Sequence, residues 1–81
     1  MKLQVKKPIF AESASLFVNT ISEYEDTVLL KKDHWVVDAK SLLGVLAVSL
    51  QPGQTVEFDV QGTNEEAIKQ SLIEKDLFKE A

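Results

Sequence analysis

The sequence predicts a single domain of the α+β class, with strands and helices in the order β-α-β-β-α-β-α. Its 81 residues leave room for one domain and not for two. Residues 56–60 alternate apolar and polar side chains, which is typical of a strand with one buried face. Residues 11–24 instead repeat apolar side chains at helical spacing. A Pro-Gly pair at residues 52–53 indicates a turn between the later elements.

The N-terminal part of the chain predicts one strand followed by one helix. Leu3 and Val5 alternate with polar residues, and the strand should end near Pro8, which cannot donate a backbone hydrogen bond. A helix is then expected from Ala11 to Ser22 or Glu23. Its apolar stripe comprises Ala11, Ala14, Phe17, Val18, Ile21 and Tyr24. Its polar face comprises Glu12, Ser13, Ser15, Asn19, Thr20 and Glu23.

A hairpin and a short helix are expected in the middle of the chain. Residues 27–32 predict a strand, residues 31–34 a tight turn and residues 34–38 a second strand. Residues 42–48 form a short apolar segment whose periodicity fits either a strand or a helix. Ser41 precedes this segment, and serine favours the N-cap position, so we expect one or two helical turns.

The last third of the chain predicts a strand and a helix. The Pro-Gly pair fits a type II turn, because proline fixes φ and glycine supplies a positive φ. The strand at residues 56–60 follows this turn. Thr63 and Glu66 match a helix capping box, with Thr63 at the N-cap. The last helix is expected to run to about Phe78.

Composition and charge exclude several classes of function. The net charge of −4 argues against nucleic acid and anionic membranes as partners. The chain contains no cysteine, so it has no disulfide, thiolate metal ligand or cysteine nucleophile. Glu57 and Asp59 are expected to form a solvated strand face rather than a metal site or a catalytic pair.

No apolar run approaches the ~20 residues of a membrane span. No apolar segment follows the N-terminal lysines, so we also expect no signal peptide. We therefore expect a cytoplasmic protein without metal or cofactor.

Residues 8–18 read Pro-Ile-Phe-Ala-Glu-Ser-Ala-Ser-Leu-Phe-Val. This stretch resembles the active-site segment of HPr, the small histidine-phosphorylated carrier of the bacterial sugar phosphotransferase system, which reads Gly-Ile-His-Ala-Arg-Pro-Ala-x-Leu-x-Val. Phe10 stands at the position of the family histidine, Glu12 at that of the arginine and Ser13 at that of the proline. The residues around these positions match the family motif, whereas the residues that carry its chemistry are replaced.

Two further segments support this resemblance. Residues 40–46 read Lys-Ser-Leu-Leu-Gly-Val-Leu, similar to the family's Lys-Ser-Ile-Met-Gly-Val-Met, and residues 60–62 give a weaker match. The resemblance spans nearly the whole chain, so we expect one HPr-like domain over residues 1–81. It implies an open-faced β-sandwich, in which helices cover one face of a four-stranded antiparallel sheet.

The replacements remove the chemistry of phosphoryl transfer. The family histidine accepts the phosphoryl group through an imidazole nitrogen at a helix N-terminus, and the arginine hydrogen-bonds its oxygens. Phe10 offers no nucleophile. Glu12 would repel an incoming phosphate by as much as about 4 kcal/mol, for unit charges ~4 Å apart at an effective dielectric constant of about 20. We therefore predict no catalytic residue, no phosphohistidine transfer through this site and no enzyme activity.

Two other residues are candidates for phosphorylation. His34, the only histidine, falls in the predicted hairpin turn, which favours a surface histidine over a phosphate acceptor. Ser41 matches the regulatory serine of Gram-positive members of the family. A phosphate there would sit at the helix start and add about two negative charges beside Leu42, Leu43 and Leu46. The alternative interpretation is a helix N-cap that meets no kinase.

The resemblance favours a regulatory protein that binds protein partners, such as a serine kinase or a transcription regulator of carbon catabolite control. The candidate docking residues are Phe10, Glu12, Leu42, Leu43 and Leu46. More than half of the leucine surface is nevertheless expected to be core, since a short amphipathic helix must bury one face. Two other classes remain open: a phosphocarrier that uses a different residue, and a structural interaction domain.

Overall fold

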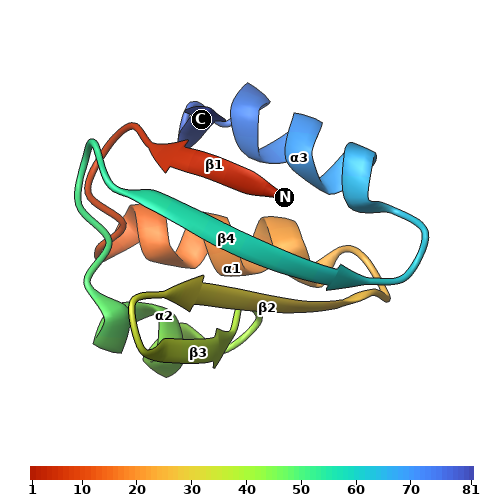
Figure 1. The fold of residues 1–81 in the computed structure, drawn as a ribbon, viewed down its shortest axis with the longest axis horizontal. Coiled ribbons are helices and arrows are strands. Elements are labelled where there is room, and N and C mark those ends of the chain that lie inside the picture. Colours follow the sequence, from red (N-terminus) through yellow and green to blue (C-terminus); the bar gives the residue numbers. More distant parts are fainter.

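The computed structural model describes all 81 residues, which form a five-stranded antiparallel sheet with three helices on one face (Figure 1). The strands are β1 (Lys2–Val5), β2 (Thr27–Lys32), β3 (Trp35–Asp38), β4 (Thr55–Gln61) and β5 (Phe78–Glu80). The helices are α1 (Glu12–Ser22), α2 (Leu42–Val48) and α3 (Glu65–Glu74). The strand order is β3-β2-β4-β1-β5, so β3 and β5 form the two edges of the sheet. The predicted α+β class and open-faced architecture are confirmed, with one strand more than expected.

The additional strand follows a helix that ends earlier than predicted. α3 stops at Glu74 rather than near Phe78. Asp76 adopts a left-handed φ of 62°, and the N–H groups of Asp76 and Leu77 donate to carbonyls of the last helical turn, which is a Schellman termination. The chain then turns so that Leu77 and Phe78 are buried and Phe78 pairs with Val5 of β1. The spacing of apolar residues did not predict β5, because a three-residue edge strand forms only through its pairing with β1.

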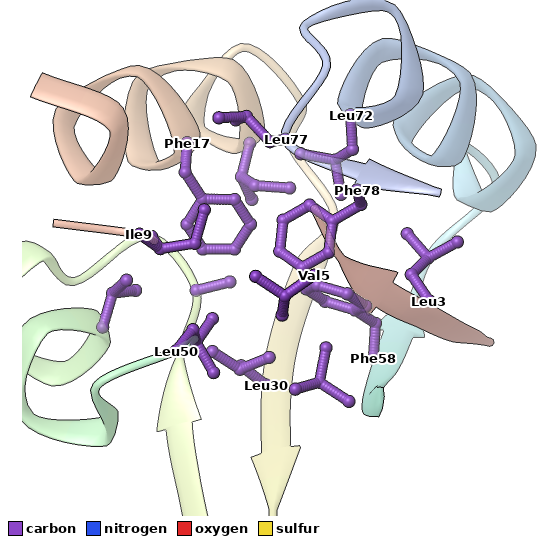
Figure 2. Close-up of a cluster of buried hydrophobic side chains, with 14 of the residues drawn as sticks. Leu3, Val5, Ile9, Phe17, Leu30, Leu50, Phe58, Leu72, Leu77 and Phe78 are labelled. Atoms are coloured by element: carbon purple, nitrogen blue, oxygen red, sulfur yellow. The ribbon is translucent and has the colours of Figure 1, made fainter. Parts of the chain in front are cut away.

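Three phenylalanines join α1 to the sheet at the centre of the core. Phe17 of α1, Phe58 of β4 and Phe78 of β5 are almost fully buried, and their ring centroids lie 5.5 to 6.1 Å apart (Figure 2). Tilted and edge-on rings at these separations make favourable aromatic contacts. Because this packing fixes α1 against the sheet, it also fixes where the N-terminus of α1 lies.

The buried face of α1 is broader than the predicted stripe. Its buried residues are Ala14, Phe17, Val18, Thr20 and Ile21. Thr20 was expected on the polar face, but its Oγ1 donates to the Leu16 carbonyl at 2.7 Å, so its own helix satisfies the buried hydroxyl. Ala11, expected on the stripe, precedes the helix and is exposed.

The N-terminus of α3 is capped from a distant loop, and the predicted capping box of Thr63 and Glu66 is wrong. The N-cap is Asn64, whose side chain makes no capping bond. The buried carboxylate of Asp26 instead accepts hydrogen bonds from the Asn64 backbone N–H at 2.8 Å and from its Nδ2 at 2.7 Å. These two bonds hold the pKa of Asp26 below its usual value. A Cβ at Gly62 would overlap this carboxylate, so the close approach requires glycine.

The middle of the chain follows the prediction. β2 and β3 form a hairpin whose two turn residues are Asp33 and His34. The ambiguous apolar segment is the helix α2, and Ser41 is its N-cap. At the predicted type II turn, the Gln54 N–H donates to the Gln51 carbonyl at 3.2 Å and Gly53 has a φ of 90°.

Candidate functional site

The segment that enters α1 buries one residue and exposes the next. The N–H of Ile9 donates to the carbonyl of Leu50 at 3.1 Å, and both side chains are fully buried. Because Leu50 follows α2, this hydrogen bond brings the start of α1 beside the end of α2 (Figure 1). The side chain of Phe10, in contrast, is 71% exposed.

Ser13 closes a tight turn over residues 10–13. Its N–H donates to the Phe10 carbonyl at 3.2 Å, and its Oγ accepts the Phe10 N–H at 2.9 Å. The same Oγ lies 2.7 Å from the carbonyl oxygen of Pro8, to which it donates. Ala11 has φ 54° and ψ −120°, a conformation that favours glycine. The turn therefore satisfies the backbone of Phe10 locally and leaves its ring facing solvent.

The charges near this segment leave Glu12 unpaired. Lys6 forms an ion pair with Asp76, and the Lys7 ammonium lies 3.9 Å from the same carboxylate. The hydrogen bond from Lys6 holds the pKa of Asp76 below its usual value. Glu12, the first residue of α1, is exposed and makes no ion pair. The site thus presents an aromatic ring and a carboxylate, and it lacks a nucleophile at position 10 and a cation at position 12.

Ser41 occupies the N-terminus of α2. Its Oγ accepts the Gly44 N–H at 3.2 Å, and its carbonyl accepts the Val45 N–H at 3.0 Å. The residue is partly exposed. The N-cap interaction is therefore confirmed, whereas phosphorylation of Ser41 stays a prediction.

The three candidate leucines of α2 differ in their surroundings. Leu43 is 81% exposed and Leu42 is 40% exposed. Leu46 is partly buried and packs against the core, while the buried face of the helix is formed by Val45 and Val48. The exposure of the three leucines therefore decreases from Leu43, which lies in solvent, to Leu46, which packs against the core. Their role in binding a partner stays a prediction.

Two exposed apolar residues on β3 were not foreseen as surface features. Trp35 and Val36 are both at least half exposed. Their exposure follows from the position of β3 at the sheet edge, which no local pattern reveals. His34 is exposed in the preceding turn and has no ion-pair partner.

A polar depression lies at the C-terminal end of α1, lined by residues 23–26 and 61–64. It includes Asp26, whose two carboxylate oxygens both bind Asn64.

No three histidine, cysteine or acidic side chains are grouped so as to hold a metal ion. On β4, Glu57 is exposed and Asp59 lies 3.8 Å from the Lys31 ammonium, as expected for a solvated face. No helix is long and apolar enough to cross a membrane.

A family model described as the phosphorylation site of the HPr component of the phosphotransferase system matches residues 1–75. The chain belongs to the HPr family. The predicted membership of this family is thereby confirmed. Members of the HPr family are phosphocarriers and regulators rather than enzymes in themselves.

HPr-family proteins of bacteria align with most of the chain. The chain is 29% identical to HPr-like protein Crh of Bacillus subtilis over 72 residues, which cover 89% of this chain and 85% of Crh. It is 34% identical to phosphocarrier protein HPr of Treponema pallidum over 59 residues, which cover 73% of this chain and 67% of that protein. The crystal structure of HPr-C-His from Thermoanaerobacter tengcongensis is 28% identical and superimposes with a TM-score of 0.80, covering 91% of this chain and 85% of that one. These similarities agree with the HPr fold described above.

Proposed function

We propose that this chain is a cytoplasmic regulatory member of the HPr family that binds protein partners and does not carry phosphoryl groups on a histidine. The observation that supports this most directly is Phe10, an exposed apolar ring at the start of α1, where the family motif has histidine. A phenyl ring has no lone pair with which to attack phosphorus, so it cannot relay a phosphoryl group. Glu12 adds negative charge where a phosphate needs positive charge.

The same region supports a role in protein binding. We define the docking surface as Phe10, Glu12, Leu42, Leu43 and Leu46. Exposed aromatic and aliphatic side chains of this kind form the centres of many protein interfaces. A solved structure of Crh from Bacillus subtilis, described as a catabolite repression protein, is 26% identical to this chain, covers 93% of it and has a TM-score of 0.70. This relative supports a role in carbon regulation.

Ser41 is the proposed switch. A serine kinase would transfer the γ-phosphoryl group of ATP to the Ser41 Oγ: the new P–O bond replaces the bond from the γ-phosphorus to the bridging oxygen, ADP leaves, and the hydroxyl proton is lost. The Gly44 N–H, which now donates to this Oγ, is positioned to donate to the phosphate instead. The phosphate would add about two negative charges next to Leu42 and Leu43 and so change which partners the docking surface accepts.

The absence of histidine transfer is tested with phosphoenolpyruvate and the upstream kinase of the phosphotransferase system. We expect the intact mass of the protein to show no phosphoryl adduct, while an authentic HPr in the same reaction is modified. An adduct on His34 or another residue would instead support the phosphocarrier alternative.

The switch is tested with ATP and the serine kinase of the family. We expect the wild type and the Ser22→Ala variant to be phosphorylated and the Ser41→Ala variant to remain unmodified. Ser22 is a suitable control because it is an exposed serine at the far end of α1. A wild type that stays unmodified would favour an interaction domain without this switch.

A further inference from the structure

We infer that the free edge of β3 pairs with the same edge of a second copy of this chain, so that two sheets join into one across a two-fold axis. The surface concerned, which we call the β3 edge, comprises residues 34–38. It shares no residue with the docking surface. The inference therefore goes beyond the proposed function, and its test is independent of the phosphorylation assays.

The backbone of β3 is paired on one side only. β2 is its single neighbour in the sheet (Figure 1). The Ala39 N–H donates to the Val28 carbonyl at 2.9 Å, which continues the register of the β2–β3 hairpin. Hydrogen-bonded pairs alternate along an antiparallel ladder, so every second residue counted back from Ala39 binds β2. Val36 and Asp38 are the other two residues of β3, and their N–H groups point away from the sheet, where another strand can accept them.

The two edges of the sheet differ in how they are protected against such pairing. β5 carries the exposed charges of Lys79 and Glu80, and Glu80 forms an ion pair with Lys69 of α3. Charged side chains on an edge strand oppose the addition of another strand. β3 instead begins Trp-Val-Val, which favours strand pairing, and contains no lysine or proline. Trp35 is 50% exposed and Val36 is 59% exposed, so the β3 edge is apolar and accessible.

The side chains of the β3 edge match those of a second copy in one register. In antiparallel pairing about a two-fold axis, an outward-facing residue of one copy opposes an outward-facing residue of the other. With Val36 on the axis, Val36 faces its own counterpart, and its N–H and carbonyl bind those of the second copy. Trp35 then faces Val37 of the second copy, and His34 faces Asp38. Aromatic side chains opposite β-branched ones, and a histidine opposite a carboxylate, are favourable cross-strand pairs.

The next register fits less well. A shift that places Val36 opposite Asp38 sets an apolar side chain against a carboxylate and leaves His34 without a partner. In the favoured register both groups gain one, since neither His34 nor Asp38 forms an ion pair within the chain. One oxygen of the Asp38 carboxylate accepts the Lys40 N–H at 2.9 Å, and no hydrogen bond within the chain occupies the other.

The charge around the β3 edge permits a second copy to approach. The net charge of −4 repels copies at long range. Residues 31–40, however, include three lysines and two aspartates, so this segment does not add to the repulsion. An interface of two short strands falls in the smallest class of specific contacts, and the dimer is therefore expected to be weak and to form as the concentration rises.

The test measures the mass of the full chain by sedimentation equilibrium from about 10 µM to about 1 mM. We expect the weight-average mass to rise from that of a monomer toward that of a dimer, and hydrogen exchange of the Val36 amide to slow over the same range. Val36→Lys should weaken dimerisation at least about tenfold, because it sets two ammonium groups against each other on the axis. Leu16→Lys is the control, since it makes the same change at an exposed leucine of α1, and it should leave dimerisation unchanged.

The register is tested at His34. His34→Asp places a carboxylate opposite Asp38 at two symmetric positions and should weaken the dimer about three- to tenfold, whereas His34→Lys should strengthen it. Gln70→Asp and Gln70→Lys make the same charge changes at an exposed residue of α3 and should have little effect. Equal effects at residues 34 and 70 would overturn the register.

Three results would overturn the pairing itself. The first is a chain that stays monomeric at about 1 mM. The second is a dimer that Val36→Lys leaves intact, which would show that the copies meet through another surface. The third is an equal loss in Leu16→Lys and Val36→Lys, which would indicate a response to net charge. None of these results bears on phosphoryl transfer or on the Ser41 kinase assay.

Discussion

Replacing Phe10 with histidine should restore a nucleophile on an intact scaffold. The Phe10 side chain is 71% exposed, so we expect the substitution to change the free energy of unfolding by about 0.5 kcal/mol or less. The backbone N–H and carbonyl of residue 10 bind Ser13 and do not depend on the side chain. The turn should therefore present an imidazole at the place where it now presents a phenyl ring.

Glu12 should nevertheless make this variant a poor phosphate acceptor. Two unit charges ~4 Å apart repel by about 1 kcal/mol in water and by about 4 kcal/mol at an effective dielectric constant of about 20. Glu12 is exposed, so solvent and salt place the repulsion in the lower part of this range. A barrier increase of about 1 to 2.5 kcal/mol slows transfer roughly 5- to 70-fold. Exchanging Glu12 for arginine replaces the repulsion by charge-assisted hydrogen bonds.

The assay measures the rate of phosphohistidine formation from phosphoenolpyruvate through the upstream kinase. We expect no product with the wild type, slow transfer to Phe10→His and transfer at least about fivefold faster to Phe10→His/Glu12→Arg. Phe10→His/Glu23→Arg is the control, since it makes the same charge change at an exposed residue just beyond α1. Equal rates for the two double variants would refute the local electrostatic reasoning. A Phe10→His/Glu12→Arg protein that accepts no phosphoryl group would refute the assignment of residue 10 to the phosphate site.

Three further predictions concern stability. Ser41→Ala removes the N-cap of α2 and should lower the free energy of unfolding by about 1 kcal/mol in urea denaturation, whereas Ser41→Asp keeps an acceptor and should lose less; equal losses would argue against the cap. Phe78→Ala should lose about 3 to 5 kcal/mol because it empties the aromatic centre of the core, while Lys79→Ala on the same strand should change little. A loss below about 1 kcal/mol for Phe78→Ala would contradict the packing of β5. Acid should remove the contribution of the Asp26 carboxylate. Its native pKa lies below the ordinary 3.8, so this contribution is fully present above that value and disappears as the pH falls through the native pKa. Asn64→Ala removes the side-chain hydrogen bond and keeps the backbone one, so it should flatten this acid dependence in part, measured as urea midpoints against pH. An unchanged slope would show that the Asn64 side chain does not contribute to it.

The candidate site was predictable where it depends on near neighbours in the chain. The cap at Ser41 involves Gly44, three residues away, and a local motif can therefore reveal it. The residues around Phe10 match the family motif, so the position of its exposed ring at the start of α1 could likewise be predicted from the sequence. The differing exposure of Leu43 and Leu46 was not predictable in detail, because the sheet and α1 set which side of α2 faces the core.

The sequence alone determined the order of the first seven elements and the loss of the family's phosphoryl-transfer chemistry. Apolar side chains that face a core repeat about every two residues in a strand and about every 3.6 residues in a helix, so the sequence itself carries this pattern. Phe10 is not a nucleophile and Glu12 is not a cation, whatever their position in the fold. Packing alone makes Phe78 part of a strand and Asp26 the acceptor that caps α3. Each of these depends on a partner distant in sequence, β1 for Phe78 and Asn64 for Asp26, and a short window of residues cannot contain both members of such a pair.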